Sequence, residues 1–184
     1  MGAGSRVRSF VALPVPDGFA TRLGSLMREL EPVVPGLRFV RTESIHVTLC
    51  FLGSATEEQL AILAPRLQAA AARCPRGEAR VAGLGLFPER GAPRVLFIGL
   101  ALPERFATLQ RECEAAAVAA GFVLENRPFH PHLTLGRWSS RSRRPRLPAA
   151  DLGPCPLEDL VLFASNTLPG GSVYTRQAQF PLPG

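Results

Sequence analysis

The tetrapeptide His-x-Thr-Leu occurs twice in this chain, at His46–Leu49 and at His132–Leu135. The chain has only three histidines, and two of them begin these tetrapeptides. Both copies alternate polar residues with large apolar residues, a pattern that predicts a half-buried β-strand. Side chains two residues apart in a strand project from the same face. We therefore expect the His and the Thr of each copy on an open sheet face, with the apolar residues between them in a core.

The rest of the chain predicts an alternation of helices and strands. Three amphipathic helices are expected, over 18–30, from 56 to about 73, and over 103–120. Pro32, a capping box at Thr56–Gln59 and Gly121 mark helix ends. Further strands are expected at 8–15, 37–41, 79–87, 94–100, 158–164 and 172–180. Turns are expected at Gly53-Ser54 and at Pro169-Gly170-Gly171. Residues 139–148 are polar and rich in Arg, which predicts a mobile loop.

This order of elements, with one His-x-Thr-Leu strand in each half, favours an α+β fold. The length suits a single bilobal domain that spans residues 1–184. We expect two similar lobes, each a mostly antiparallel sheet backed by helices, that meet across a central cleft. Each wall of the cleft would carry one His-Thr pair. Such a cleft needs no second chain, so a monomer is expected.

Composition constrains the partners and the compartment. The net charge is +6 and all 21 basic residues are Arg, which suits a phosphate-bearing partner and equally well a solvated surface. The four cysteines are scattered, which excludes zinc-ribbon and thioredoxin motifs and suits free thiols in a reducing compartment. No segment has the length of a membrane span, and the first residues lack a secretory apolar core, so a cytoplasmic protein is expected.

Two histidines on opposite walls of a cleft form an acid–base pair. The unperturbed pKa of His is about 6.5, so near neutral pH one ring can accept a proton while the other donates one. Cleavage of a phosphodiester needs both steps, on the attacking and on the leaving oxygen. The neighbouring Thr hydroxyls can donate hydrogen bonds to the phosphoryl oxygens, where negative charge accumulates. No cluster of Asp and Glu accompanies either motif to hold a metal, so no cofactor is expected.

Four segments of the sequence resemble the two-histidine (HxTx) phosphoesterase superfamily, and within it the RNA 2′,3′-cyclic phosphodiesterase (2′-5′ RNA ligase) family. They are Arg8–Leu13, His46–Gly53, the hairpin at 83–99, and Pro131–Arg137. The resemblance implies a bilobal fold whose two lobes are pseudo-two-fold related around the central cleft. It also implies a phosphodiesterase that hydrolyses RNA or nucleoside 2′,3′-cyclic phosphate to a 2′-phosphate without a metal. RNA ends or cyclic nucleotides are the implied partners, and 2′-5′ RNA ligation is the implied reverse reaction.

The resemblance also implies roles for individual residues. His46 would be the proton donor to the leaving 3′-oxygen and His132 the proton acceptor from water, with the roles exchanged in ligation. Thr48 and Thr134 would bind the phosphate. Arg137 matches a position where the family often carries Arg beside the phosphate. In an unbroken strand Arg137 points away from the His132 face, so it reaches the site only if a β-bulge occurs at the adjacent glycine.

Other imidazole and aromatic side chains are weaker candidates. His130 shares a strand face with His132, but Pro131 and the lack of further ligands argue against a metal site, so a substrate-side or solvent position is expected. Phe51 has the strand parity of core residues and is therefore expected in the core rather than against a nucleobase. Three other aromatic residues remain open as nucleobase contacts or core residues: Phe39, Phe129 and Tyr174.

Two further questions stay open at the level of sequence. Arg137, Arg141, Arg143, Arg144 and Arg146 form either an RNA-backbone footprint or a solvated loop, and only a footprint makes RNA binding weaken steeply with salt. The alternatives to an RNA phosphodiesterase are a nucleotide- or RNA-binding module without turnover, and the same chemistry on another substrate. Such a substrate would be ADP-ribose 1″,2″-cyclic phosphate or a 2′-5′ oligoadenylate.

Overall fold

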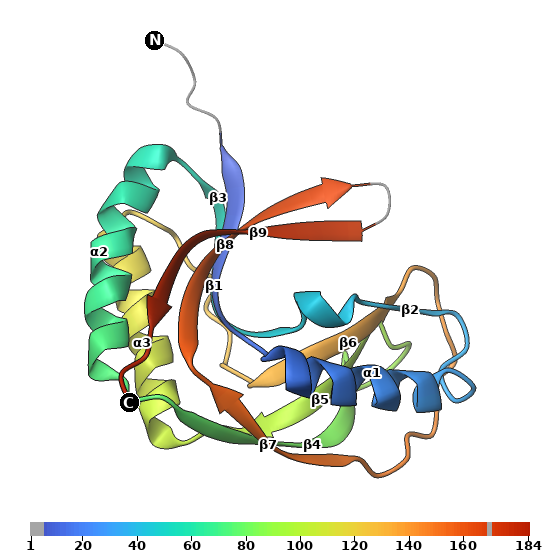
Figure 1. The fold of residues 1–184 in the computed structure, drawn as a ribbon. Coiled ribbons are helices and arrows are strands. Elements are labelled where there is room, and N and C mark those ends of the chain that lie inside the picture. The colour runs from blue at the N-terminus through green and yellow to red at the C-terminus, as the bar shows by residue number, and fades with distance from the viewer. Residues whose placement is uncertain (1–5, 169–170) are drawn as a thin grey trace.

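A single curved β-sheet forms the frame of the protein in this computed structural model, which describes residues 6–168 and 171–184 (Figure 1). The strands are β1 (Val7–Pro14), β2 (Leu37–Phe39), β3 (His46–Ala55), β4 (Gly77–Phe87), β5 (Val95–Ala101), β6 (His132–Trp138), β7 (Asp151–Leu157), β8 (Asp159–Leu168) and β9 (Gly171–Pro181). The helices are α1 (Asp17–Leu30), α2 (Glu57–Arg73) and α3 (Glu104–Ala119), with a 3₁₀ helix η1 (Thr42–Ser44). The expected α+β class is confirmed.

The sheet has two halves that meet at the His-x-Thr-Leu strands. The strand order is β7-β4-β5-β6-β3-β1-β8-β9, β2 pairs with β6, and the pairings are antiparallel. β3 and β6 share one paired position, Val47 opposite Leu133. α2 and α3 pack against each other and against β3, β8 and β9, whereas α1 lies against η1 and β7 in the other half (Figure 1). The expected pair of antiparallel, helix-backed lobes is therefore present.

Local sequence signals account for the faces and ends of the helices. The predicted apolar stripe of α1 is buried and consists of Phe19, Leu23, Leu26, Met27 and Leu30. The capping box of α2 is formed: the Thr56 hydroxyl accepts from the Gln59 amide, and the Gln59 side chain accepts from the Thr56 amide, both at 3.2 Å. α3 ends before Gly121, whose φ of 81° suits a residue without a Cβ.

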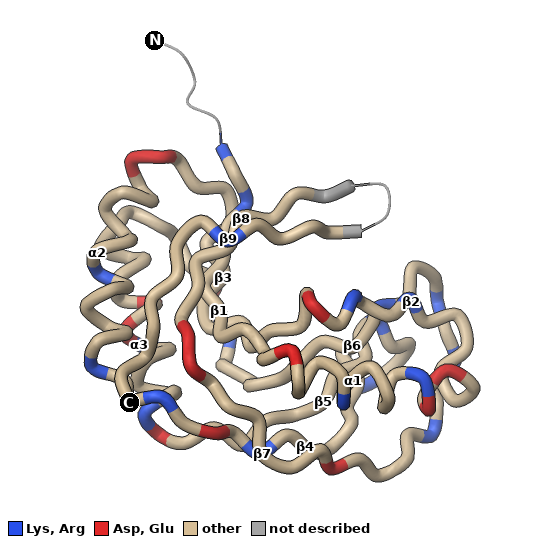
Figure 2. Tube along the Cα trace, viewed as in Figure 1, with Lys and Arg blue, Asp and Glu red and all other residues tan. Residues whose placement is uncertain are grey.

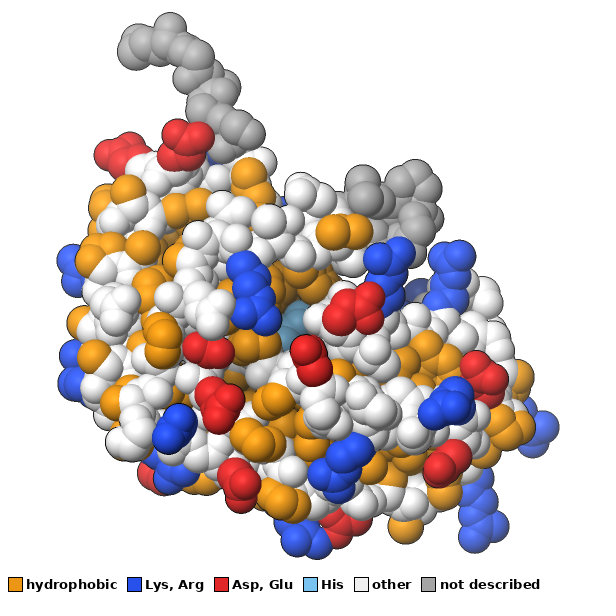
Figure 3. Space-filling model, viewed as in Figure 1, with side chains coloured by type: hydrophobic (Ala, Val, Ile, Leu, Met, Phe, Trp, Pro, Cys, Tyr) orange, Lys and Arg blue, Asp and Glu red, His pale blue; other side chains and the backbone are white. Residues whose placement is uncertain are grey.

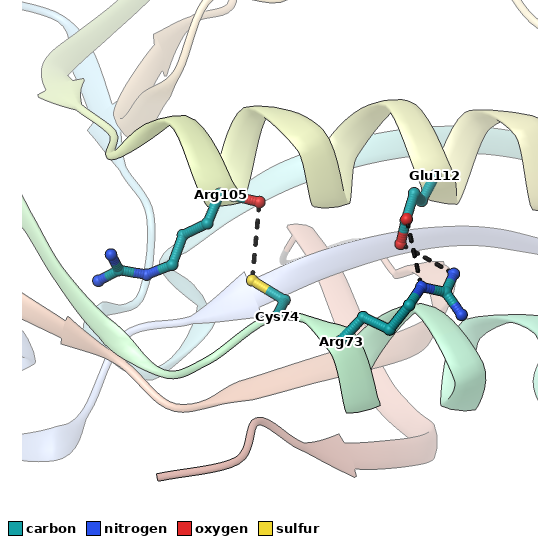
Figure 4. A network of polar contacts seen from close by, with 4 residues as sticks. All are labelled: Arg73, Cys74, Arg105 and Glu112. Atoms are coloured by element: carbon teal, nitrogen blue, oxygen red, sulfur yellow. Dashed lines mark hydrogen bonds and ion pairs between the residues drawn. The ribbon is translucent and has the colours of Figure 1, made fainter.

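Polar contacts join α2 to α3 on the helical side of the sheet. Arg73 forms an ion pair with Glu112 at 3.1 Å, and the Cys74 Sγ lies 3.7 Å from the Arg105 carbonyl (Figure 4). The four cysteines are buried and free of disulfides. Burial raises the pKa of Cys50 to about 12, so this thiol stays neutral and acts as a packing residue.

Two segments differ from the sequence-based expectation. The pattern does not predict β7, because Pro154 and Pro156 lack an amide hydrogen; β7 tolerates them as an edge strand that pairs with β4 alone. β3 continues through Gly53, where a turn is expected. Two sequence-based expectations lie outside the described residues: the turn at Pro169-Gly170, and the lack of a secretory apolar core in residues 1–5. Within the described ranges, no helix has the length and apolarity needed to cross a membrane.

The Arg-rich segment 139–148 has no regular secondary structure, as expected, but it is anchored to the fold. Arg144 donates to the carbonyls of Pro88 at 3.1 Å and Gly91 at 3.4 Å, and Leu147 packs against the core. Basic and acidic residues are interspersed over the helices and loops of both halves (Figure 2). Because the fold itself uses Arg144, the footprint interpretation of this segment is weakened.

A β-bulge follows Thr48 in β3. Thr48 and Cys50 pair with adjacent residues of β1, so Leu49 between them has no partner. One extra residue reverses the in–out alternation of the strand beyond it. The prediction that Phe51 lies in the core is therefore wrong: its side chain is 71% exposed, while Leu49, Cys50 and Leu52 are buried. Phe51 lies on the strand face of His46 and Thr48.

β6 has the same bulge at the equivalent place. Thr134 and Gly136 pair with adjacent residues of β5, so Leu135 has no partner. The bulge that Arg137 requires is thus present, and Arg137 is exposed while its two predecessors are buried. A Cβ on Gly136 would lie 2.8 Å from the Arg38 carbonyl of β2, so this close approach requires glycine.

Candidate active site

The pairing of β3 with β6 brings the two His-Thr pairs together at the junction of the lobes. Val47 and Leu133 face each other and are fully buried. In an antiparallel register, their neighbours then lie opposite one another on the other face of the sheet, with each histidine beside the threonine of the other motif. This crossed arrangement gives the junction the local two-fold symmetry that the repeated motif predicts.

The paired motifs open into a hollow between the lobes. Figure 3 shows a histidine side chain in this hollow among hydrophobic side chains, with basic and acidic side chains around the rim. The four motif side chains are partly exposed: His46, Thr48, His132 and Thr134. A site of this kind admits a ligand while it excludes much of the water, which strengthens electrostatic interactions inside it.

The same backbone contact orients both imidazole rings. His46 Nδ1 lies 2.7 Å from the Ser44 carbonyl, and His132 Nδ1 lies 2.6 Å from the His130 carbonyl. A carbonyl only accepts, so Nδ1 is the protonated nitrogen and donates in each case. The lone pair of each neutral ring is then on Nε2. The carbonyl two residues earlier therefore holds each ring ready to exchange a proton at Nε2.

Aromatic rings enclose His46. Phe10 of β1 stacks on its imidazole with a centroid distance of 4.7 Å, and Tyr174 of β9 meets it edge-on at 5.3 Å. Phe163 of β8 lies 5.9 Å away. The sequence pattern leaves the role of Tyr174 open and does not indicate Phe10 or Phe163, because β1, β8 and β9 come together with β3 only through long-range pairing. The core alternative holds for the two other aromatic candidates, since Phe39 and Phe129 pack against the main core.

A second aromatic pair encloses His132. Phe87 and Phe97 stack on each other at 4.3 Å and meet the His132 ring edge-on at 5.2 and 5.4 Å. Gly85 makes room for this pair, because a Cβ there would overlap the Phe97 ring. The side chain of His130, the third histidine, is exposed, and its carbonyl rather than its ring orients His132.

Gly85→Ala is expected to displace Phe97 and, through it, the His132 ring. We expect kcat/KM to fall roughly 10- to 100-fold, because a catalytic group misplaced by about 1 Å costs up to about 10²-fold. Gly18→Ala is the matched control, since nothing lies near its Cβ position. Steady-state kinetics and thermal melts of both variants check this. Unchanged kcat/KM in a folded Gly85→Ala variant would show that the Phe97 ring does not position His132.

Both catalytic candidates are neutral at neutral pH without a ligand. Burial lowers the pKa of His46 to about 4; the Ser44 carbonyl opposes this, and the charges of His132 and Arg137 add to it. Burial also lowers the pKa of His132. The hydrogen bond to the His130 carbonyl raises this pKa, and the charge of Arg137 lowers it further. An anion bound between the rings would stabilise imidazolium and raise both pKa values.

The positive charge of Arg137 lowers the pKa of both histidines. Its side chain is exposed on the site face beyond the β6 bulge. A guanidinium at this place is suited to pair with a phosphate, through hydrogen bonds that its planar fork directs at two oxygens. Among residues 6–168 and 171–184, no group of three or more His, Cys, Asp or Glu side chains is close enough to hold a metal ion.

The paired, oriented imidazoles agree with the family that the sequence resembles. A model of the family described as LigT-like phosphoesterase matches residues 13–97 and 99–174. The chain belongs to this family. It is therefore a hydrolase of the two-histidine phosphoesterase type, as the repeated motif predicts.

Three relatives illustrate the similarity, and each is named RNA 2′,3′-cyclic phosphodiesterase. The protein from Thermus thermophilus is 33% identical over 97% of this chain and 91% of its own length. The protein from Methanothermobacter thermautotrophicus is 29% identical over 96% of this chain and 100% of its own length. The protein from Geobacillus stearothermophilus is 31% identical over 97% of this chain, which spans 58% of that longer relative.

Solved structures share the fold. The crystal structure of TT0787 from Thermus thermophilus has a TM-score of 0.85 at 30% identity, and the match covers 96% of this chain and 98% of that one. LigT from E. coli, complexed with 3′-AMP, has a TM-score of 0.84 at 24% identity over 98% of this chain and 100% of that one. The LigT fold is therefore established for this chain.

Proposed function

We propose that this protein is an RNA 2′,3′-cyclic phosphodiesterase that forms a 2′-phosphate without a metal ion. The observation that carries the proposal is the β3–β6 pairing, which brings together two histidines whose Nδ1 atoms are held by backbone carbonyls. Nothing in simple ligand binding calls for two such proton-exchanging groups. The names of the relatives support the same activity.

In the proposed reaction, His132 Nε2 takes a proton from water as the water oxygen attacks phosphorus. His46 Nε2 gives a proton to the 3′-oxygen as the bond from phosphorus to that oxygen breaks. The products are a 2′-phosphate monoester and a free 3′-hydroxyl, and the two rings exchange protons with solvent to reset. The hydroxyls of Thr48 and Thr134 donate to the non-bridging oxygens, and Arg137 balances their charge.

The two histidines differ in how well their surroundings suit these roles. The acid role of His46 comes from the family resemblance, whereas burial favours a neutral ring there. In the proposed reaction, the negative charge of the bound phosphate therefore has to raise the pKa of His46 so that its ring is protonated.

Metal independence is supported by the lack of a carboxylate or cysteine cluster in the described chain. Incubation with a nucleoside 2′,3′-cyclic phosphate in EDTA tests this: full turnover supports the proposal, and activity that returns only with added divalent cations contradicts it.

The substrate proposal extends to RNA ends and cyclic nucleotides, since the hollow is open and lies between lobes of one chain. We also propose that the protein acts as a monomer in the cytoplasm. The junction of the lobes is complete within one chain, and the free, buried thiols suit a reducing compartment.

Arg137→Gln is expected to raise the pKa of both histidines, because the guanidinium disfavours imidazolium. The pair is productive when one ring is protonated and the other is not, so wild-type kcat/KM should peak below pH 6.5, the ordinary His pKa, and fall as the pH rises through neutrality. In the variant, the pH range over which kcat/KM falls should move to higher pH, although overall activity drops because the charge that balances the phosphate is lost. Titration of the imidazole ¹⁵N signals by NMR checks the shift directly, and unchanged values would place Arg137 away from the rings.

A further inference from the structure

Gln110 of α3 is a polar side chain in the core. Among residues 6–168 and 171–184, only Gln110 and Ser9 are polar and buried, and Gln110 is 5% exposed. A buried amide costs free energy unless it finds a hydrogen-bond partner. The Nε2 of Gln110 donates to the carbonyl of Leu49 at 3.4 Å, across the contact between α3 and β3. This hydrogen bond ties the helix to the strand that carries the first His-Thr pair.

The residue that Gln110 holds is the bulge residue of β3. Leu49 has no partner in β1, because Thr48 and Cys50 on either side of it pair with adjacent residues of that strand. On its other edge, β3 pairs with β6 at Val47 alone. Strand pairing therefore leaves the backbone at Leu49 weakly fixed, and the side chain from α3 fixes it instead.

The second lobe fixes its bulge in another way. The carbonyl of Leu135, the bulge residue of β6, accepts from the backbone amide of Val40 at 2.9 Å. Val40 directly follows β2, which pairs with β6. The described chain has no strand in this place beside β3, where Gln110 supplies the donor. The equivalent carbonyl is thus held by the main chain in one lobe and by a side chain in the other.

We propose that Gln110 is a positioning residue for Thr48, an inference that rests on the proposed function. Thr48 immediately precedes the bulge, so a shift of the Leu49 carbonyl also shifts the peptide that sets the direction of the Thr48 hydroxyl. In the proposed reaction this hydroxyl donates to a phosphoryl oxygen. Gln110 is buried behind the strand and acts on the substrate only through the backbone of β3.

A double-mutant cycle between Gln110 and Thr48 tests this inference. Gln110→Met keeps the length of the side chain and removes the donor. It should lower kcat/KM for adenosine 2′,3′-cyclic phosphate about 10-fold, within the range for a group misplaced by up to about 1 Å. The loss should appear mainly in kcat, because the Thr48 hydrogen bond strengthens as charge accumulates. In a Thr48→Val background, Gln110→Met should cost less than about 2-fold, because the hydroxyl that it positions is absent.

Cys113→Ala is the matched control. Cys113 lies three residues further along α3 and is fully buried, so its truncation leaves a cavity in the same part of the core but keeps the Gln110 donor. This variant should melt at a lower temperature than wild type and keep its kcat/KM. It separates a general loss of stability from a loss of positioning.

The outcomes distinguish the inference from the proposed function. Unchanged kcat/KM in a folded Gln110→Met variant, or the same fold loss with and without the Thr48 hydroxyl, would overturn the positioning role. Hydrogen exchange of the backbone amides of Cys50 and Phe51 is a readout that needs no substrate. It should be faster in Gln110→Met than in Cys113→Ala, and equal rates would overturn the inference. If wild type failed to turn over the substrate, the proposed function would fail, and exchange would still decide whether Gln110 holds the bulge.

Discussion

Replacement of either paired histidine should lower kcat/KM for a nucleoside 2′,3′-cyclic phosphate by about 10²- to 10⁴-fold, the usual contribution of one general acid or base. His46→Gln and His132→Gln are the preferred variants, because both rings pack among aromatic side chains and a smaller residue would leave a cavity. The double variant should be little worse than the poorer single one, since the rings act as a unit. Steady-state kinetics at several pH values measure these losses.

The third histidine provides the comparison. His130→Ala removes an exposed ring but keeps the carbonyl that orients His132, so its loss should be far smaller. Thermal melts show whether each variant is folded. Substantial activity in a folded His46→Gln or His132→Gln variant would refute the two-histidine mechanism.

A substrate with sulfur in place of the bridging 3′-oxygen should restore the acid variant selectively. A thiol, with a pKa near 8.5 in the free amino acid, leaves as thiolate without a proton from the enzyme. In the assigned roles, His46→Gln should recover at least about 10² of its loss, the lower bound for a general acid, while His132→Gln should recover nothing. Parallel assays of the oxygen and sulfur substrates measure the recovery.

The reverse pattern would exchange the two roles. Recovery of His132→Gln instead would make His132 the acid, a result in line with the burial that disfavours a proton on His46. Recovery of both variants, or of neither, would contradict a mechanism in which one histidine protonates the leaving oxygen.

Much of the fold follows from local patterns in the sequence. The stripe from Phe19 to Leu30 is buried because its spacing places apolar residues on one helical face. The capping box at Thr56 starts α2 because it satisfies amides that the first turn leaves free. The alternation around Val47 and Leu133 likewise assigns a core face and a site face to each motif strand. These effects act within a few residues, so the sequence reveals them.

What the sequence does not reveal depends on partners far away in the chain. The bulges at Leu49 and Leu135 are properties of strand pairing, so simple parity places Phe51 on the wrong face. Strand parity alone would also place Arg137 on the wrong face, and only the adjacent Gly136 indicates the bulge that brings it to the site face. The sequence does not predict β7, because its two prolines are tolerated only in an edge strand. Which strand lies at the edge depends on the order of strands in the whole sheet. The aromatic wall around His46 is assembled from strands distant in sequence.

The most direct test of the account is the identity of the product. Purified protein is incubated in EDTA with adenosine 2′,3′-cyclic phosphate, and the monophosphate is identified by chromatography against both isomers and by ³¹P NMR. We expect 2′-AMP, formed by wild type and formed at least about 10²-fold more slowly by both His46→Gln and His132→Gln. Formation of 3′-AMP would contradict the assignment of the leaving oxygen, and turnover at the wild-type rate after loss of either histidine would contradict the paired-histidine site itself.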